Sequence, residues 1–381
     1  MHDLPLVDQH CHAIRLDELD TGAFEALCSE SPYPAGNGSH LDGPVGFAIR
    51  RWCPPVLDLE PFCSWDIYLA RRAQLGAVEV SRRLLRAAGH ELLLVDTGYR
   101  GDELCSLADL STLAGTPTRE IVRIEVVAEE LAEAMRAVDA ADDLRAEDFL
   151  ASFERRLRER CATAVGMKSI LAYRCGFDLD LVGGNLAGAR VSPALAAAVP
   201  TWLAAGGQLD DPAIEAAIIG VAARLSGELG LPLQFHVGYG DPDVVLHRSN
   251  PSLLTSFIEW CRPIGTRIVL LHCWPFEREA GFLATVYPHV WMDVGLSMNY
   301  LGPSAPAFFF RALECAPWPK VLYSSDAFGL AELYLAGAQQ FRWALGQVLD
   351  DWVGAGSVPA REVGHIATGI AGRNARALYR L

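Results

Sequence analysis

Eight short apolar runs constrain the fold of this chain more than any other feature of its sequence. Each run is rich in Val, Ile and Leu, and each ends at a polar or glycine-containing stretch. The runs are Leu4–Val7, Leu92–Val95, Ile121–Val127, Val165–Ile170, Leu231–Phe235, Ile268–Leu271, Val290–Val294 and Val321–Tyr323. Their apolar residues are continuous rather than alternating, as is typical of parallel strands that are buried on both faces.

Stretches with helical spacing separate most of these runs. Examples are Glu147–Cys161, Pro212–Leu229 and Pro251–Cys261. Eight strands that alternate with helices predict an α/β fold, the (β/α)8 TIM barrel. We expect residues 1–381 to form a single domain of this kind.

Two intervals between the runs are too long to be simple crossover connections. Residues 13–90 follow the first predicted strand, and residues 173–211 follow the fourth. In a barrel both would leave from the carboxyl ends of strands, where enzymes of this fold build their sites. We therefore expect helical insertions that cover or wall a substrate pocket, with surface insertions of no functional role as the alternative.

Composition and charge exclude some classes of function. The formal net charge of −15 argues against a nucleic-acid-binding surface, which needs clustered Lys and Arg. No apolar run is long enough to span a bilayer. Residues 1–10 do not resemble a signal peptide, and the ten cysteines form no CxxC pair. We therefore expect a cytoplasmic protein with a small-molecule substrate. A homo-oligomer is left open, because Phe308–Phe310 could line an interface or the core.

The strongest chemical signal is the sequence His10-Cys11-His12. Alternate side chains of a strand share a face, so His10 and His12 point the same way and Cys11 points oppositely. Two imidazoles on one face at the end of a strand suit a transition-metal ion. Taken alone, the pair is explained about equally well as two polar residues in a loop.

Four further residues favour the metal-binding interpretation. His236 and His272 end the fifth and sixth predicted strands, Asp326 follows the eighth, and Lys168 lies in the fourth. Because the carboxyl ends of barrel strands gather at one end of the fold, we expect these side chains to meet there. Scattered structural histidines would not be expected to fall in these places.

The order of these residues along the strands resembles that of the amidohydrolase superfamily. The segments that carry the resemblance are VDQHCHAI, GMKSILAYRCGF, PLQFHVGYGDPD, NPSLL, IVLLHCWPF, MDVGLS, YSSDAFG and GIAGRNARALY. They resemble the amidohydrolase-2 (Amidohydro-rel) branch, and within it the TIM-barrel metal-dependent hydrolases related to the nodulin/FluG N-terminal domain. The resemblance covers nearly the whole chain and is weakest in residues 13–90.

This resemblance implies a set of metal ligands. The positions that match the family's ligands are His10, His12, Lys168, His236, His272 and Asp326. Lys168 matches a lysine that is carboxylated in binuclear members and bridges two divalent ions. The implied cofactor is a pair of zinc ions, with Mn or Fe as alternatives. The alternative for Lys168 is an unmodified ammonium group above a single ion.

Other residues just beyond the strand ends are candidates for binding the substrate. Tyr173 and Arg174 follow the fourth strand, where Arg174 could hold a substrate carboxylate bidentately. A salt bridge that fixes the following loop is an equally good explanation of Arg174. Trp274 and His247 are further candidates, each more easily explained as structural.

The resemblance implies an enzyme of the amidohydrolase type. We expect it to cleave an amide, or another acyl C–N or C–O bond, of a small carboxylate-bearing molecule by a metal-activated hydroxide. Asp326 would ligate a metal and act as the catalytic proton acceptor. The alternatives are a metal-dependent decarboxylase or isomerase of the same superfamily and a non-catalytic binding protein on this scaffold.

Overall fold

The computed structural model of the protein describes residues 1, 3–137, 145–182 and 191–381. Eight parallel strands, paired in chain order, form its central sheet. They are β1 (Leu6–Cys11), β2 (His90–Asp96), β3 (Thr118–Arg123), β4 (Gly166–Ser169), β5 (Leu233–Val237), β6 (Ile268–His272), β7 (Val290–Asp293) and β8 (Val321–Leu322). The backbone N–H of Gln9 donates to Tyr323, and that of Asp326 donates to His10, so β1 is joined to the chain after β8. The predicted (β/α)8 barrel is confirmed.

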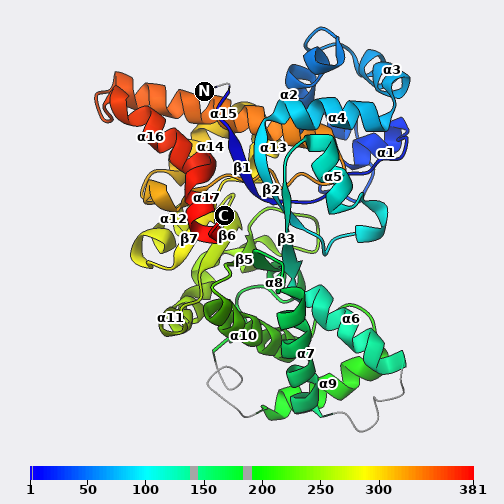
Figure 1. The fold of residues 1–381 in the computed structure, drawn as a ribbon, viewed down its shortest axis with the longest axis vertical. Helices are drawn as coiled ribbons and strands as arrows, with labels where there is room; N and C mark the ends of the chain where they lie inside the picture. Colours follow the sequence, from blue (N-terminus) through cyan, green and yellow to red (C-terminus); the bar gives the residue numbers. More distant parts are fainter. Residues whose placement is uncertain (2, 138–144, 183–190) are drawn as a thin grey trace.

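Helices surround the barrel. They are α1 (Thr21–Ala26), α2 (Pro44–Trp52), α3 (Trp65–Leu75), α4 (Ala77–Ala88), α5 (Leu107–Ala114), α6 (Ile124–Ala137), α7 (Ala146–Arg160), α8 (Leu171–Arg174), α9 (Pro193–Ala205), α10 (Pro212–Leu229), α11 (Thr255–Ile264), α12 (Glu277–Val286), α13 (Ser297–Leu301), α14 (Ala305–Ala312), α15 (Ala331–Gly354), α16 (Val363–Thr368) and α17 (Asn374–Tyr379). Short helical turns are η1 (His40–Asp42), η2 (Pro54–Leu57), η3 (Gly101–Glu103), η4 (Leu246–Ser249), η5 (Pro251–Leu254), η6 (Gly302–Ser304), η7 (Trp318–Lys320), η8 (Ala360–Glu362) and the π-turn η9 (Gly369–Arg373). Figure 1 shows α15, from the C-terminal part, lying beside α2 and α4 from the N-terminal part.

Apolar side chains fill the barrel away from its polar strand ends. One buried cluster combines strand residues with residues of α17, and its members are Val7, Leu92, Leu94, Ile121, Val269, Leu271, Leu322, Ala375, Leu378 and Tyr379. A larger cluster packs the outer faces of the strands against the helices. Every residue of β1, β5 and β6 is buried, as continuous apolar strands predict.

One strand prediction was wrong at its end. The run Ile121–Val127 was expected to be a single strand, but β3 ends at Arg123 and α6 begins at Ile124. The buried residues Ile124, Val127 and Ala128 of α6 have the i, i+3, i+4 spacing of a helix face. The sequence did not show where the strand ends and the helix begins, because the helix follows the strand directly and the apolar run continues through both.

The two long intervals add helices to the barrel. Residues 13–90 contain α1, α2 and α3, followed by α4, which packs between α15 and α5 as the crossover helix of the first strand. In residues 173–211, α9 packs against α6, α7 and α10. The residues Gly183, Gly184 and Asn185 of that interval lie outside the described part of the chain.

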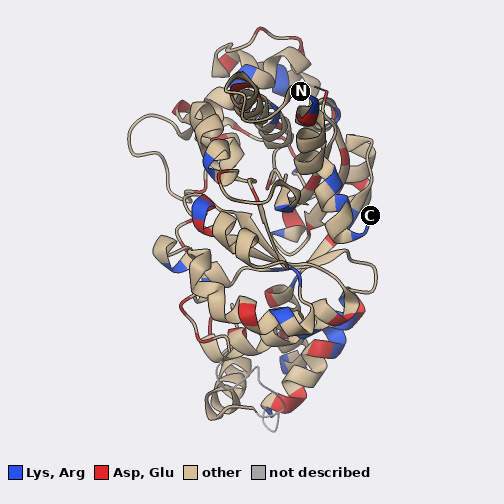
Figure 2. Cartoon of the chain, turned by 90° about the vertical axis from the view of Figure 1, so that its left-hand side faces the viewer, with Lys and Arg blue, Asp and Glu red and all other residues tan. Residues whose placement is uncertain are grey.

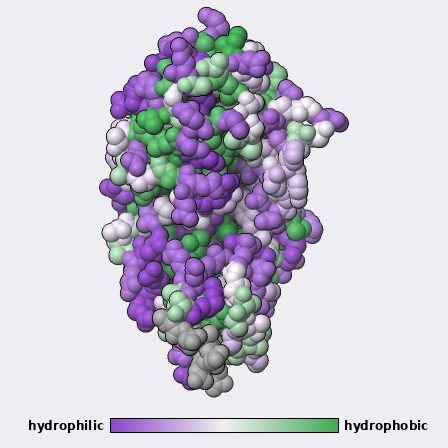
Figure 3. Space-filling view, turned by 90° about the vertical axis from the view of Figure 1, so that its right-hand side faces the viewer, coloured by the Kyte–Doolittle hydropathy of each residue, from purple (hydrophilic) through white to green (hydrophobic). Residues whose placement is uncertain are grey.

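The surface carries charges of both signs. In the view of Figure 2, Lys and Arg alternate with Asp and Glu over the outer helices. The face in Figure 3 is mostly hydrophilic, with apolar residues in scattered patches. Among the described residues, no helix is long and apolar enough to cross a membrane.

Candidate metal centre

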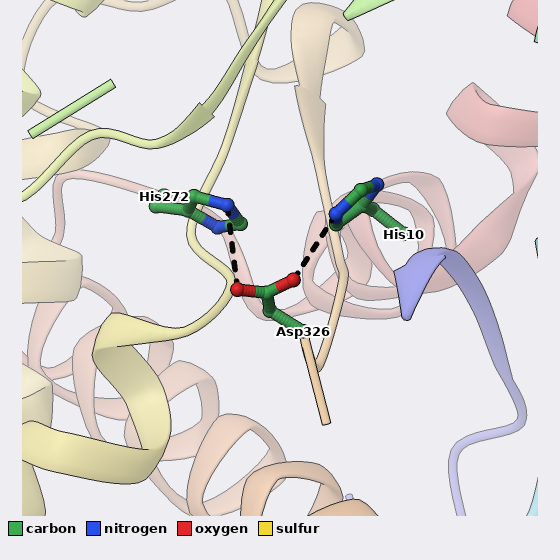
Figure 4. A group of neighbouring side chains, drawn as sticks. All are labelled: His10, His272 and Asp326. Atoms are coloured by element: carbon green, nitrogen blue, oxygen red, sulfur yellow. Dashed lines mark ion pairs between the residues drawn. The ribbon is translucent and has the colours of Figure 1, made fainter. Parts of the chain in front are cut away.

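The predicted ligands come together at the carboxyl end of the barrel. Asp326 lies between His10 and His272 (Figure 4). Its Oδ1 atom is 3.1 Å from Nε2 of His10 and 3.5 Å from Nε2 of His12, and its Oδ2 atom is 3.5 Å from Nε2 of His272. Residues far apart in the sequence therefore direct nitrogen and oxygen donors into one small space.

Hydrogen bonds to the Nδ1 atoms, which face away from Asp326, fix the tautomers of two histidines. Nδ1 of His10 is 2.8 Å from Oε1 of Gln234, and Nδ1 of His12 is 3.1 Å from the carbonyl oxygen of Asp96. Both partners are acceptors, so each Nδ1 carries the proton and each Nε2 keeps its lone pair. An outward N–H bond of this kind is the usual arrangement for a histidine that binds a metal.

We expect the replacement of Gln234 by Leu to weaken metal binding about 10- to 100-fold, because His10 would lose the acceptor that orients its ring. Competition with a coloured chelator measures this change. A matched control is Gln340→Leu, which removes another buried amide, bonded to the carbonyl of Met298. A Gln234→Leu protein with wild-type metal affinity would show that this hydrogen bond does not support the centre.

The ring nitrogens of His272 are buried. In the described part of the chain, neither of them has a hydrogen-bond partner, although Oδ2 of Asp326 is 3.5 Å from Nε2. Its backbone φ of 70° lies in the left-handed region, as does the φ of 50° at Asp326. Strain of this kind at non-glycine residues is concentrated at functional sites. The orphaned imidazole next to an anionic oxygen fits a bound cation.

Lys168 and His236 complete the cluster. The Lys168 side chain is buried, and its Nζ atom is 3.4 Å from Nε2 of His10. Nε2 of His236 is 2.9 Å from the carbonyl oxygen of Tyr239, so it carries the proton and leaves Nδ1 with the lone pair. The His236 ring lies 4.7 Å from that of His272 between centroids. The structure thus brings all six predicted ligand residues to one place.

The electrostatics of the cluster favour the protonation states that bind metals. Burial, and then the charge of Lys168, lower the pKa of His10 to about 4. Burial acts to raise the pKa of Asp326, but His272, His10 and His12 outweigh it and hold that pKa well below its usual value. Burial also lowers the pKa of Lys168 to about 8. A neutral imidazole beside a carboxylate anion is ready to ligate a divalent ion.

Sequence reasoning missed three polar residues that end other strands. Asp96 ends β2, and its carboxylate forms a second compact group with His10 and His12. Arg123 ends β3 and is paired with Asp96 at 2.7 Å. Asp293 ends β7 and accepts a hydrogen bond from the backbone of His272. The signal that found His236 and His272, a polar residue directly after an apolar run, was present at Asp96. It was not present at Arg123 and Asp293, which lie inside the runs Ile121–Val127 and Val290–Val294.

A cavity of about 960 Å³ opens beside the cluster. Its wall includes His12, Lys168, His236 and Asp326 from the cluster. Both long intervals reach it, since several residues between Gly22 and His40, together with residues 173–174 and 208, also line it. A smaller space of about 200 Å³ adjoins it and is lined by Trp274, Tyr239 and Tyr300.

The four predicted substrate-binding residues do not all line the same cavity. Tyr173 and Arg174 line the larger cavity. Nη2 of Arg174 is 3.2 Å from Glu129, so the loop-fixing salt bridge that was the alternative is formed. Trp274 lines only the smaller space, and His247 is exposed on η4 and lines neither. The position of His247 after β5 suggested a place near the pocket, but η4 holds this residue at the surface.

Comparisons with known proteins show the family to which the chain is related. A sequence model described as amidohydrolase matches residues 107–381. The FluG protein of Emericella nidulans is 27% identical over 404 residues, which cover 99% of this chain and 46% of that protein. The chain therefore spans about half the length of that relative.

Solved structures share the fold. A protein of Lactobacillus casei described as a metal-dependent hydrolase is 26% identical, with a TM-score of 0.84 over 100% of this chain and 96% of that chain. A uronate isomerase of Thermotoga maritima is 14% identical, with a TM-score of 0.63 over 99% of this chain and 95% of that chain. The second likeness is one of fold alone.

Proposed function

The chain belongs to the amidohydrolase family, and on that premise we propose that it is a metal-dependent hydrolase. The bond cleaved would be an amide, or another acyl C–N or C–O bond, of a small molecule that enters the cavity. One observation carries the proposal: Asp326 lies within 3.5 Å of Nε2 atoms of His10, His12 and His272, next to a cavity large enough for a substrate.

The proposed ligands are the six residues of the cluster, namely His10, His12, Lys168, His236, His272 and Asp326. Lys168 would bridge two ions as a carbamate, formed when its neutral amine adds CO₂ and loses a proton. Burial favours that neutral amine, because desolvation disfavours the ammonium ion. Zinc suits imidazole and carboxylate donors, and Mn or Fe are alternatives. A single ion beside an unmodified Lys168 is the competing arrangement.

The chain's own groups supply the proton transfers and the positioning. When bound, a divalent ion polarises the carbonyl and lowers the pKa of water towards 7. Asp326, held as an anion by the surrounding histidines, accepts a proton from the attacking water. It then passes that proton to the leaving nitrogen as the C–N bond breaks. Arg174 would hold a substrate carboxylate through the guanidinium nitrogens that Glu129 leaves available.

A decarboxylase or an isomerase is the second enzymatic candidate, because uronate isomerases share this fold. Fold does not decide the reaction. The two classes differ in the origin of the product's oxygen atoms, since only hydrolysis by attack of water at an acyl carbon places a solvent oxygen in the new carboxylate.

The proposal is tested on purified protein of measured metal content, with a panel of simple amides and N-acyl amino acids in water enriched in oxygen-18. We expect at least one substrate to be cleaved only by metal-replete protein, with one solvent oxygen in the released carboxylate. Cleavage at an unchanged rate after removal of the metal by a chelator would contradict the proposal. So would a product formed without solvent oxygen.

A further inference from the structure

The smaller space of about 200 Å³ differs in chemistry from the cavity that it adjoins. The two share Ser29, His40 and Tyr300 in their walls. No Lys, Arg, Asp or Glu is among the described residues that line the smaller space, whereas Lys168, Arg174 and other charged side chains line the larger cavity. A molecule that fits both spaces would therefore have a polar end and an apolar end.

Three aromatic side chains line the smaller space as a connected group. The ring of Tyr239 is 5.6 Å from that of Trp274 and 5.4 Å from that of Tyr300, between centroids. Val45 of α2 and Leu301 of α13 add aliphatic surface. Aromatic rings attract one another in edge-to-face and offset arrangements at separations of this size. An aromatic ligand can make the same kind of contact with these walls.

The polar side chains of the same wall have partners within the protein. Oγ of Ser297 donates to the backbone carbonyl of His272 at 3.2 Å. Nε2 of His40 is 2.9 Å from the carbonyl oxygen of Tyr33, and Oγ of Ser29 accepts a hydrogen bond from a backbone N–H two residues later. An apolar cavity of about 150 Å³ is enough to bind benzene in another protein. The smaller space is therefore large enough for one six-membered ring.

The aromatic wall is joined to two of the proposed metal ligands. Tyr239 follows His236 by three residues, and Trp274 follows His272 by two, so at most about 11 Å of extended chain separates each pair. The backbone N–H of Tyr239 donates to the carbonyl of Trp274 at 2.8 Å. At Gly238, φ is 77° and a Cβ atom would lie 2.1 Å from that carbonyl oxygen, so glycine permits this approach. A ring bound against this wall therefore belongs close to the bond that is cleaved.

We propose that the smaller space binds an aromatic ring of the substrate, close to the amide bond that is cleaved. This inference rests on the proposed function, because it names the class of amide that the site would take. That class is an N-acylated aromatic amino acid. Its carboxylate would lie in the larger cavity, where Arg174 is proposed to hold it, and its ring would fill the smaller space.

Binding is tested without chemistry by titrating 3-phenylpropanoate and propanoate into purified metal-replete protein and recording heats. Both molecules carry a carboxylate, and neither has a bond that a hydrolase cleaves. We expect 3-phenylpropanoate to bind about 10- to 100-fold more tightly, because its ring leaves water for an apolar space. Equal binding of the two would overturn the inference. Binding of 3-cyclohexylpropanoate as tight as that of 3-phenylpropanoate would overturn the assignment of an aromatic ring.

Two substitutions test whether the smaller space is the place of binding. Val45→Phe fills it, and we expect the preference for 3-phenylpropanoate to disappear. Val78→Phe is the matched control, because Val78 is exposed on α4 and lines neither space, and it should keep the preference. Tyr300→Ala removes one ring of the wall and should reduce the preference about three- to tenfold. Thermal melting curves show whether each variant is folded, and a full preference in a folded Val45→Phe or Tyr300→Ala protein would overturn the inference.

Turnover separates this inference from the proposed function. With N-acetylphenylalanine and N-acetylalanine as paired substrates, we expect kcat/KM to be about 10- to 100-fold higher for the first, and Val45→Phe to remove the difference. If neither is cleaved but 3-phenylpropanoate binds with the expected preference, the inference stands and the hydrolase proposal loses support. If both are cleaved equally well and Val45→Phe changes neither rate, the hydrolase proposal stands and the inference fails.

Discussion

Replacing Asp326 by Asn is expected to lower kcat about 10²- to 10⁴-fold, with the fold retained. The amide has nearly the shape of the carboxylate, but it cannot accept the proton of the attacking water. It also lacks the negative charge that lies 3.1 Å from His10 and 3.5 Å from His272. The measurement is steady-state turnover of the best amide in the panel, at a metal content matched between the two proteins.

A second aspartate provides the control for this experiment. Asp178 pairs with Arg248 at 2.7 Å, and neither residue lines the cavity, so Asp178→Asn should change kcat less than about twofold, as surface substitutions usually do. Undiminished turnover by metal-replete Asp326→Asn would remove Asp326 from the mechanism. An equal loss in Asp178→Asn would point to general instability instead.

Replacing Lys168 by Met is expected to lower activity by at least about 100-fold, together with the loss of one ion per chain. Loss of a residue that merely orients a ligand already lowers metal affinity or activity 10- to 100-fold. Lys168 is proposed as a ligand itself. Methionine fills much of the same buried volume but cannot form a carbamate. The metal content of both proteins and their turnover are the two quantities to measure.

The chain has only two lysines, so Lys320→Met is the natural control. The Nζ atom of Lys320 donates to the carbonyls of Ala284 and Tyr287, away from the cavity. That variant should keep both its metal and its activity. Wild-type metal content in Lys168→Met would contradict the bridging role and favour the single-ion arrangement.

The metal cluster could be predicted because its residues mark the ends of apolar strands. His236 and His272 each close a continuous run, and a barrel brings such ends together. Asp96 follows the same rule, whereas Asp293 lies inside the apolar run Val290–Val294, so the sequence does not mark it as the end of a strand. The fold could be predicted from the same apolar runs, except where α6 follows β3 without a turn.

The cavity wall formed by the stretch between α1 and η1 could not be predicted in the same way. This stretch has neither a strand period nor a motif. Its contact with the cavity comes from how the interval after β1 folds over the barrel, which depends on tertiary packing. The pairing of Arg174 with Glu129 of α6 also depends on packing, so sequence alone left the two interpretations of Arg174 open.

An anomalous-scattering map of crystals grown with zinc tests the proposed metal centre directly. We expect ion peaks about 2.0–2.2 Å from the ring nitrogens of His10, His12, His236 and His272 and from the carboxylate of Asp326. We also expect added density on Nζ of Lys168. The absence of any peak at these residues, with zinc bound only elsewhere, would contradict the proposed metal centre.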